Sequence, residues 1–179
     1  MKIIDNFLEE KEFKKIQQTM MGFSFPWYYH IHSSYEGDFQ SSLTYMFYNF
    51  EVPGKSAGAF SVTDVGLELL YPVLRKLKSV ALVRIKANLT FPNKEKHFMH
   101  TDFKFKGLKT AIYYINTNDG GTKIKNKFVK SIENRIVIMP SSMSHSTVRH
   151  TDTAIGRFVI NFNYYEEQND AQHKGFDWA

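Results

Sequence analysis

The sequence predicts an α+β fold in which two N-terminal helices pack on one sheet of a double-stranded β-helix, or jelly roll. Apolar residues recur at helical spacing in two segments of the first 80 residues, whereas short strand-like segments separated by turns fill most of the remainder. Aromatic residues make up 16% of the chain, with 16 Phe and 10 Tyr, which favours a β-rich fold. Helices followed by a run of strands are typical of the α+β class.

The N-terminal part is expected to contain two strands and two helices. A short strand is predicted over residues 2–7, and a helix over residues 8–21 with an apolar stripe formed by Phe13, Ile16 and Met20. Residues 42–50 are rich in Tyr and Phe and are typical of a strand. Asp64 can cap a second helix that extends to Leu77. Both apolar stripes are interpreted as packing surfaces without a function.

The C-terminal part is expected to be a series of strands. They are predicted over residues 81–90, 109–116, 127–131, 135–139, 145–149 and 157–165, with turns such as Asn-Asp-Gly-Gly at 118–121. The chain has no internal repeats, no low-complexity tracts and no linker rich in Pro and Gly. We therefore expect one domain over residues 1–179, with a jelly-roll core at about 80–165.

Composition excludes several kinds of site. The 179 residues include no cysteine, so disulfides, zinc–thiolate sites and cysteine nucleophiles are excluded. Neither a signal peptide nor an apolar run of membrane-spanning length is visible, so we expect a cytoplasmic protein without a membrane partner. The net charge of +5 permits an acidic or nucleic-acid substrate without indicating one. The sequence leaves the oligomeric state open.

A candidate metal site begins at His100-Thr101-Asp102. On an extended strand, side chains two residues apart point to the same face, and His145 from a later strand can supply a third ligand. Two imidazoles and one carboxylate with open positions opposite are typical of non-haem Fe(II) oxygenases. Arg157, on the last predicted strand, offers a planar cation that matches a carboxylate.

Other histidines compete for the metal. His97 has the opposite strand parity to His100, so we expect it to point away. His150 has the opposite parity to His145 and is the less favoured third ligand. His30 and His32 have no carboxylate at ligand spacing, so a polar loop or edge-strand pair is the favoured interpretation. A place at the substrate entrance is the alternative, because this segment follows the first helix.

In this order, these residues resemble the 2-oxoglutarate- and Fe(II)-dependent dioxygenases, in the branch similar to prolyl 4-hydroxylases. The sequence looks especially similar to the small members from phages and bacteria, and a phage-encoded member would act in the host cytoplasm. The resemblance is strong over residues 82–165, and it extends less specifically to the N-terminal strand and helix and to Phe25-Pro26-Trp27.

The resemblance implies a role for each candidate residue. Fe(II) would be bound by His100, Asp102 and His145, and the distal carboxylate of 2-oxoglutarate by Arg157 and the hydroxyl of Tyr114. O2 would be the other co-substrate, and ascorbate is a further candidate. Hydroxylation of a C–H bond in a peptidyl, prolyl-like substrate would release succinate and CO2.

One position departs from the pattern of the family. Where relatives often carry Tyr-Pro, this chain has Phe91-Pro92, and Phe cannot donate a hydrogen bond. Asn88, from the same strand region, is the candidate substitute for this contact with 2-oxoglutarate. Counting by two from Arg157 places three further side chains on the same inward face: Val159, Asn161 and Asn163.

Alternatives remain for the function and the substrate. One is a non-catalytic jelly-roll module that uses its pocket for recognition, and others are a metal-dependent hydrolase or a cupin isomerase. An oxygenase could act on nucleic acid or a free metabolite as well as on a peptide. We expect substrate selection on residues 25–40, which are rich in Tyr and His, and on residues 103–108, where Lys and Phe alternate.

Overall fold

The computed structural model describes residues 1–30, 41–50, 66–92, 97–152 and 154–167. Two α-helices are present in these ranges, α1 (Glu10–Met21) and α2 (Tyr71–Lys76), and a 3-10 helix, η1 (Leu67–Leu70), runs directly into α2. The strands, in chain order, are β1 (Lys2–Ile4), β2 (Tyr28–His30), β3 (Ser42–Asn49), β4 (Ser79–Thr90), β5 (Lys109–Tyr114), β6 (Gly121–Ile124), β7 (Lys127–Lys130), β8 (Arg135–Pro140), β9 (His145–Val148) and β10 (Arg157–Glu166).

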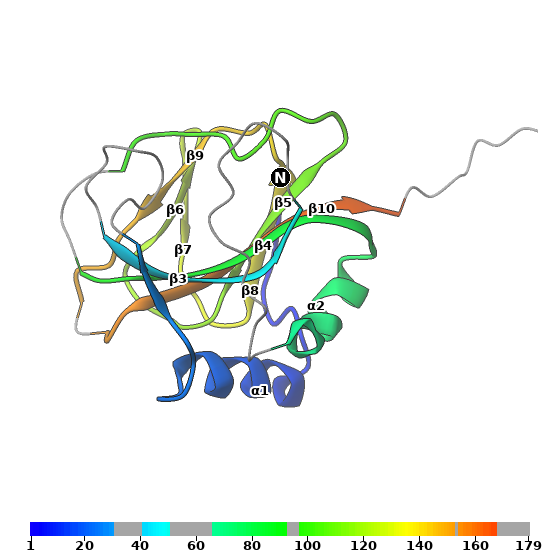
Figure 1. Cartoon of the computed structure of the whole chain (residues 1–179). Helices are drawn as coiled ribbons and strands as arrows, with labels where there is room; N and C mark the ends of the chain where they lie inside the picture. Colours follow the sequence, from blue (N-terminus) through cyan, green and yellow to red (C-terminus); the bar gives the residue numbers. More distant parts are fainter. Residues whose placement is uncertain (31–40, 51–65, 93–96, 153, 168–179) are drawn as a thin grey trace, which may run out of the picture.

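The strands form two antiparallel sheets. The large sheet has the order β1-β8-β5-β10-β4-β3-β2, and the small sheet has the order β7-β6-β9. Figure 1 shows α1 and α2 on one side of the large sheet and the small sheet on its other side. The structure therefore confirms a sheet-rich α+β fold, and the two facing sheets are consistent with the predicted jelly roll.

Strand periodicity divides the buried residues between two cores. On β5, Ala111 and Tyr113 pack in the cluster that includes Phe13, Ile16 and Met20 of α1. The alternate residues Ile112 and Tyr114 pack in a second cluster with residues of the small sheet. The helices therefore cover the outer face of the large sheet, and the inner face is left for the small sheet and the pocket between them.

Asn134 fixes the start of α1 against the sheet. Its backbone is left-handed, with φ of 58°, a conformation that Asn tolerates better than most residues. Its side-chain Oδ1 accepts hydrogen bonds from the backbone N–H of Leu8 (2.9 Å) and the hydroxyl of Tyr113 (2.7 Å). Its Nδ2 donates to the carbonyl of Leu8 at 2.8 Å, so one buried amide joins the chain before α1 to β5.

Most expected elements are present with ends shifted by a few residues. The first strand ends at Ile4 rather than at residue 7, and α1 begins at Glu10. The second helix is shorter than expected, since it comprises only η1 and α2, and its expected cap Asp64 lies outside the described residues. The edge-strand interpretation of His30 is confirmed by β2, whereas His32 lies outside the described residues.

The sequence prediction missed β6. Gly120 and Gly121 were expected to lie in the turn at 118–121, yet Gly121 is the first residue of a strand that pairs with both β7 and β9. A Cβ atom at Gly121 would lie 2.2 Å from the carbonyl oxygen of Val129 and 2.7 Å from the ring of Phe128. Glycine is therefore required here by close packing inside a sheet, and not by a turn.

Candidate functional site

A backbone bridge brings the two candidate histidine ligands together. The N–H of His100 donates to the carbonyl of His145 at 2.8 Å, and the N–H of His145 donates back to the carbonyl of His100 at 2.9 Å. This reciprocal pair joins a loop to β9, and it places the two imidazole rings with their centroids 4.6 Å apart. Residues 45 positions apart in the chain therefore present their rings side by side.

The Nδ1 atom of each imidazole lies near a backbone carbonyl oxygen two residues earlier in the chain. The Nδ1 of His145 lies 2.9 Å from the carbonyl oxygen of Met143, and the Nδ1 of His100 lies 3.5 Å from that of Phe98. A proton held at Nδ1 leaves the Nε2 lone pair available to a metal. Burial and the neighbouring His145 lower the pKa of His100, which favours the neutral, metal-binding form.

Three donors from the inner face of the large sheet hold the Asp102 carboxylate. Its Oδ1 accepts from Nη2 of Arg84 at 2.9 Å, and its Oδ2 accepts from Oγ1 of Thr110 at 2.9 Å and from Nδ2 of Asn163 at 3.0 Å. Burial alone would raise the pKa of Asp102, but Arg84, His145 and these hydrogen bonds outweigh it and lower the pKa. Asp102 is therefore held as a carboxylate, the form that binds metals.

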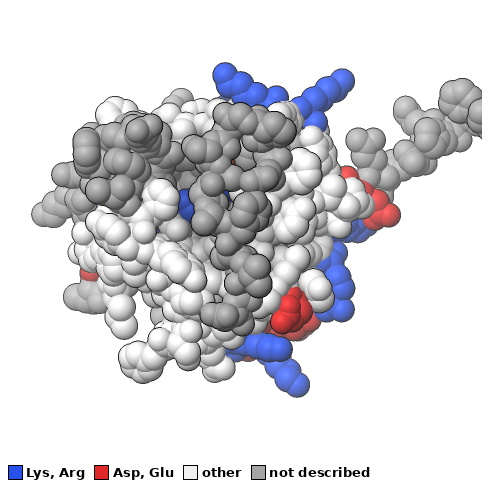
Figure 2. All heavy atoms as spheres, viewed as in Figure 1, with Lys and Arg blue, Asp and Glu red and all other residues white. Residues whose placement is uncertain are grey.

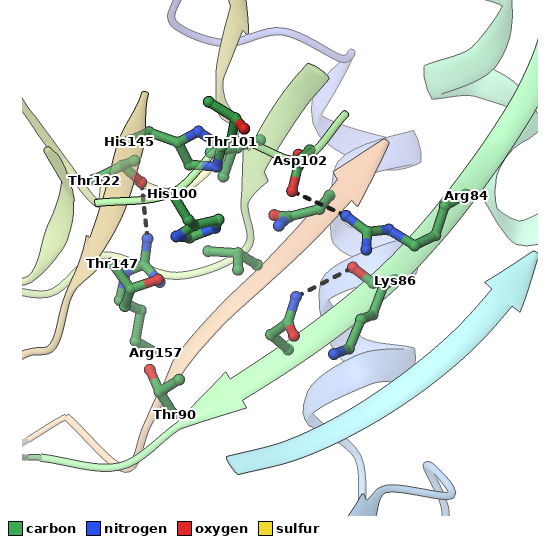
Figure 3. A pocket seen from close by; sticks show the side chains of 14 residues that line it. Arg84, Lys86, Thr90, His100, Thr101, Asp102, Thr122, His145, Thr147 and Arg157 are labelled. Carbon is green, nitrogen blue, oxygen red and sulfur yellow. Dashed lines mark hydrogen bonds and ion pairs between the residues drawn. The ribbon is translucent and has the colours of Figure 1, made fainter. Parts of the chain in front are cut away.

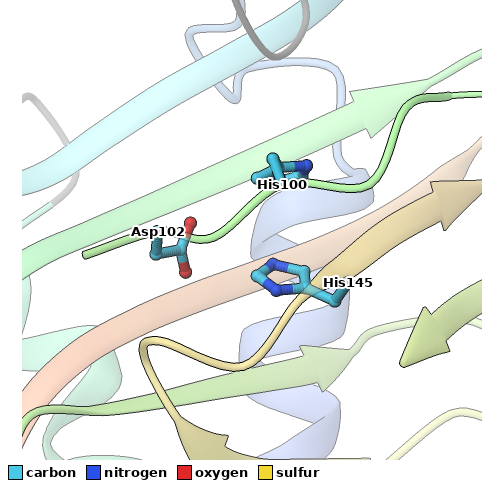
Figure 4. Close-up of side chains that lie close together, drawn as sticks. All are labelled: His100, Asp102 and His145. Carbon is cyan, nitrogen blue, oxygen red and sulfur yellow. The ribbon is translucent and has the colours of Figure 1, made fainter. Parts of the chain in front are cut away.

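The structure brings His100, Asp102 and His145 into one cluster. One donor atom from each residue lies within 4.8 Å of the others, a spacing that a single ion can bridge (Figure 4). One local expectation was wrong, because His100-Thr101-Asp102 is not a regular strand: His100 forms an isolated bridge, and Asp102 lies in a bend. The shared direction of the two side chains therefore depends on the His145 bridge and on the donors around Asp102.

Arg157 is a buried cation beside this cluster. Its side chain is 2% exposed, and no Asp or Glu carboxylate forms an ion pair with it in the described part of the chain. Nε donates to Oγ of Ser131 at 3.0 Å, and Nη2 donates to Oγ1 of Thr122 at 3.1 Å. Burial lowers the pKa of Arg157, but a guanidinium stays charged in proteins, so the structure presents a positive charge suited to an anionic ligand.

Tyr114 lies next to Arg157, as the resemblance implied. The Arg157 guanidinium is 5.6 Å from the centre of the Tyr114 ring, and the Tyr114 hydroxyl donates to Oγ1 of Thr122 at 2.8 Å. Burial raises the pKa of Tyr114, so its hydroxyl remains a donor. Asn88 lines the same pocket, where its Nδ2 is 3.4 Å from the carbonyl oxygen of Lys86. Phe91, at the position of the departure, is 42% exposed.

A polar pocket of about 320 Å³ connects the metal cluster to Arg157 (Figure 3). The large sheet supplies most of its floor, including the inward residues Arg157, Val159 and Asn161 that strand parity predicted on β10. Asn163, the next residue of that parity, bonds to Asp102. Figure 2 shows a basic side chain inside a hollow on the face in view. The volume of the pocket lies at the lower end of the range of small-ligand pockets, and its lining is more polar than is usual for them.

The competing histidines lie outside the metal cluster. His97 is buried, and its Nε2 accepts a hydrogen bond from Nε of Arg149 at 2.9 Å. His150 is fully buried, with Nε2 placed 3.0 Å from the carbonyl oxygen of Ala154. Two of the aromatic residues considered for substrate selection pack in the fold instead: Phe25 is 6% exposed, and Trp27 lies 5.8 Å from the ring of Phe158.

Sequence reasoning missed the residues that support the ligands. Arg84 was not singled out, although it shares strand parity with Asn88, which was. Thr110 and Thr122 carry no recognisable motif, and their roles depend on which strands become neighbours. Asn163 was predicted to face inward, but its bond to Asp102 follows only from the position of the loop that carries Asp102.

Searches with protein-family models and among curated proteins found no match to this chain. Solved structures do match. A prolyl hydroxylase from Trichoplax adhaerens, solved with a peptide fragment of the hypoxia inducible factor oxygen degradation domain, has a TM-score of 0.65 and 14% identity, and the match covers 92% of this chain and 83% of that one. A Pseudomonas putida prolyl-4-hydroxylase has a TM-score of 0.54 and 12% identity, with 93% and 92% covered.

The non-haem, alpha-ketoglutarate-dependent epimerase SnoN from nogalamycin biosynthesis is also similar, with a TM-score of 0.59 and 11% identity over 92% of this chain and 76% of that one. Enzymes of different reaction types therefore share this architecture, and identities this low establish the fold and not the reaction. The chain has the fold of the prolyl hydroxylases and of non-haem, alpha-ketoglutarate-dependent enzymes.

Proposed function

We propose that this protein is a 2-oxoglutarate- and Fe(II)-dependent dioxygenase that hydroxylates a C–H bond. The observation that carries the proposal is the combination of a His-Asp-His cluster with a buried Arg157 in one pocket, where none of the described Asp and Glu carboxylates pairs with Arg157. Two imidazoles and one carboxylate suit non-haem iron, and a buried guanidinium suits the distal carboxylate of a diacid. We also propose that the two sheets form the complete double-stranded β-helix of this fold.

Each residue has a definite task in this proposal. His100, Asp102 and His145 would hold Fe(II), and Arg157 would bind the distal carboxylate of 2-oxoglutarate with the Tyr114 hydroxyl and Thr122 beside it. Bound iron and 2-oxoglutarate would supply O2 activation coupled to oxidative decarboxylation, which yields succinate and CO2. The protein's own contribution is to orient these groups and to exclude water from the buried end of the pocket.

The prolyl hydroxylases among the similar structures support a peptidyl substrate, and the epimerase supports a small metabolite. A binding module remains the second candidate function. Such a module would use Arg157 to hold an acidic ligand without turnover. The two candidates differ in whether succinate is released, so one assay separates them.

The test combines turnover with binding. Wild-type protein with Fe(II), O2 and 2-oxoglutarate should release succinate even without a substrate, at a slow uncoupled rate. Calorimetric titration of the Mn(II)-loaded protein with 2-oxoglutarate should show saturable binding, which Arg157→Ala weakens by about 2–5 kcal/mol, as for a truncated buried charge pair. Arg157→Lys keeps the charge but loses the planar fork, so it should bind with intermediate affinity.

Arg75→Met is the matched control, because Arg75 is exposed and pairs only at the surface with Glu12 in the described structure. It should bind 2-oxoglutarate as the wild type does. Binding of 2-oxoglutarate without any succinate release would favour the binding module. Equal affinity in Arg157→Ala and Arg75→Met would remove Arg157 from the co-substrate site.

A further inference from the structure

We propose that the outer face of the small sheet binds single-stranded nucleic acid, on a platform formed by Phe128 and the lysines of the β6–β7 hairpin. This site goes beyond the proposed function and does not depend on it, because it lies on the back of the strands that line the pocket. It is carried by the cross-strand register of β6 and β7, by the exposed ring of Phe128, and by a run of residues, 120–132, that includes four Lys and no Asp or Glu.

The two faces of β6 and β7 carry different side chains. On the inner face, Ile124 and Val129 pack in the second core cluster, and Thr122 lines the pocket. Because side chains alternate along a strand, Lys123 and Phe128 lie on the outer face, where they form a direct cross-strand pair. Figure 1 shows the small sheet and the helices on opposite sides of the large sheet, so neither α1 nor α2 covers this outer face.

The ring of Phe128 rests against Gly121 of the neighbouring strand. A Cβ atom at Gly121 would lie 2.7 Å from one carbon of this ring and 2.8 Å from another, so the missing side chain lets the ring approach the sheet. Phe128 is nevertheless 53% exposed, and none of the cation–π contacts in the described part of the chain involves it. The sheet therefore supports one side of the ring and leaves the ring accessible to a base that stacks on it.

Four lysines lie on the same hairpin as this ring. Two share its outer face, since Lys123 lies opposite Phe128 and Lys130 lies two residues further along β7, or about 7 Å away. Lys125 lies in the turn between the strands, and Lys127 is the first residue of β7. All four are exposed, and none forms an ion pair with a carboxylate of the described residues. Their positive charge is therefore open to an external anion.

Protection of a strand edge explains only part of this arrangement. β7 is an edge strand of the small sheet, and lysines on such strands discourage aggregation. That role does not account for Lys123, which belongs to the central strand β6, or for an apolar ring exposed among the lysines. Cations beside an exposed ring fit a polyanion with planar bases, because lysines contact phosphates and an aromatic ring stacks on a base. The strand must be unpaired, since the bases of a duplex are already stacked on one another.

Fluorescence anisotropy with the full chain and a labelled oligothymidine of about twelve nucleotides tests the proposal. We expect saturable binding at low salt and a dissociation constant that rises steeply as salt is added. Each lysine that contacts a phosphate of a single strand contributes about 0.7 to the slope of log Kd against log salt concentration. An abasic strand of the same length and polyglutamate are the comparison probes, and both should bind at least fivefold more weakly, because neither offers a base to Phe128.

Two kinds of variant separate the charge from the stacking. A double variant, Lys123→Met with Lys130→Met, should weaken oligothymidine binding at least tenfold at low salt and lower the salt slope by about 1.4. Phe128→Ala should weaken binding by about 5–150-fold, the equivalent of about 1–3 kcal/mol for one stacked base, and leave the slope unchanged. Phe128→Tyr keeps the ring, so it should retain most of the affinity.

Matched controls come from α1 and the residues just after it, on the opposite side of the large sheet. A double variant, Lys11→Met with Lys15→Met, removes the same charge from exposed positions, and Phe23→Ala removes an exposed ring. Both controls should bind oligothymidine as the wild type does.

Several results would overturn the proposal. They are the lack of saturable binding, the same loss in the lysine variants of the hairpin and of α1, and equal affinity for oligothymidine and for either comparison probe. Arg157→Ala separates this site from the pocket, because it should bind oligothymidine as tightly as the wild type does. A loss of affinity in Arg157→Ala would place the strand in the pocket and contradict the assignment to the outer face.

Discussion

Arg84 is the residue that contributes most to keeping Asp102 in its charged carboxylate form, because it forms an ion pair with Asp102 and lowers its pKa. It donates to Asp102 and to Asn163, and its guanidinium lies 5.1 Å from the centre of the Phe103 ring. Phe103 in turn stacks on Phe105, with ring centroids 5.6 Å apart. One side chain of β4 therefore connects the candidate metal ligand to the 103–108 loop, where substrate selection was expected.

Removal of Arg84 should weaken metal binding. In Arg84→Met, Asp102 keeps the hydrogen bonds of Thr110 and Asn163 but loses its ion pair, so its orientation is less well fixed. We expect a 10–100-fold loss of Mn(II) affinity by calorimetry, as is typical when a partner of a metal ligand is removed. Arg75→Met is the control, and Arg84→Lys should recover part of the loss. An unchanged Mn(II) affinity in Arg84→Met would show that Asp102 does not need this partner.

At the scale of single residues, the sequence predicted which side chains gather but not what holds them. His100, Asp102, His145 and Arg157 were chosen by residue type, spacing and resemblance, and the structure places them around one pocket. The partners of Asp102 come from β4, β5 and β10, and only the strand order makes them neighbours. That order depends on long-range pairing, which local periodicity does not encode.

At the scale of elements, α1 shows how directly an apolar stripe predicts packing. Met20 is fully buried in the cluster beneath the large sheet, whereas the adjacent Met21 is 41% exposed. The helix thus contributes to the site only by supporting the outer face of the strands that carry it. The missed strand β6 shows the limit of local patterns. Gly121 is needed for close packing inside the sheet, but a pair of glycines in a sequence is typical of a turn.

Two neighbouring methionines offer a matched test of this packing. Met20→Ala should lower the free energy of unfolding by about 2–5 kcal/mol, because it leaves a cavity in the core. Met21→Ala should change it by less than about 0.5 kcal/mol, because the side chain is largely in solvent. Chemical denaturation of both variants measures the difference. Similar losses in the two variants would mean that α1 is not docked in the orientation described.

At the scale of the whole molecule, the pocket lies between two separate sheets, and no named strand of one sheet pairs with a named strand of the other. The His100–His145 bridge joins a loop to the small sheet, while Asp102 is bonded to the large sheet. Ligands that contact both sheets should therefore stabilise the fold as a unit. Among the described helices, none combines the length and the apolar character that a membrane span needs.

Metal and co-substrate should accordingly raise the melting temperature in two steps. A ligand present at 100 times its Kd stabilises the folded state by about 2.7 kcal/mol. For a chain of this size each kcal/mol corresponds to about 2–4 °C, so Mn(II) and then 2-oxoglutarate should each add several degrees in a thermal melt. Arg157→Ala should keep the shift from Mn(II) and lose most of the second one. If the second shift is as large in Arg157→Ala as in the wild type, 2-oxoglutarate binds elsewhere.

The central claim is that one ion and one diacid occupy the pocket together, and a crystal structure with Mn(II) and 2-oxoglutarate tests it most directly. The account predicts one metal with nitrogen and oxygen donors of His100, Asp102 and His145 at about 2.0–2.3 Å. It also predicts the distal carboxylate of 2-oxoglutarate on the Arg157 guanidinium. A metal bound through His97 or His150 in place of His145, or a 2-oxoglutarate carboxylate remote from Arg157, would contradict it.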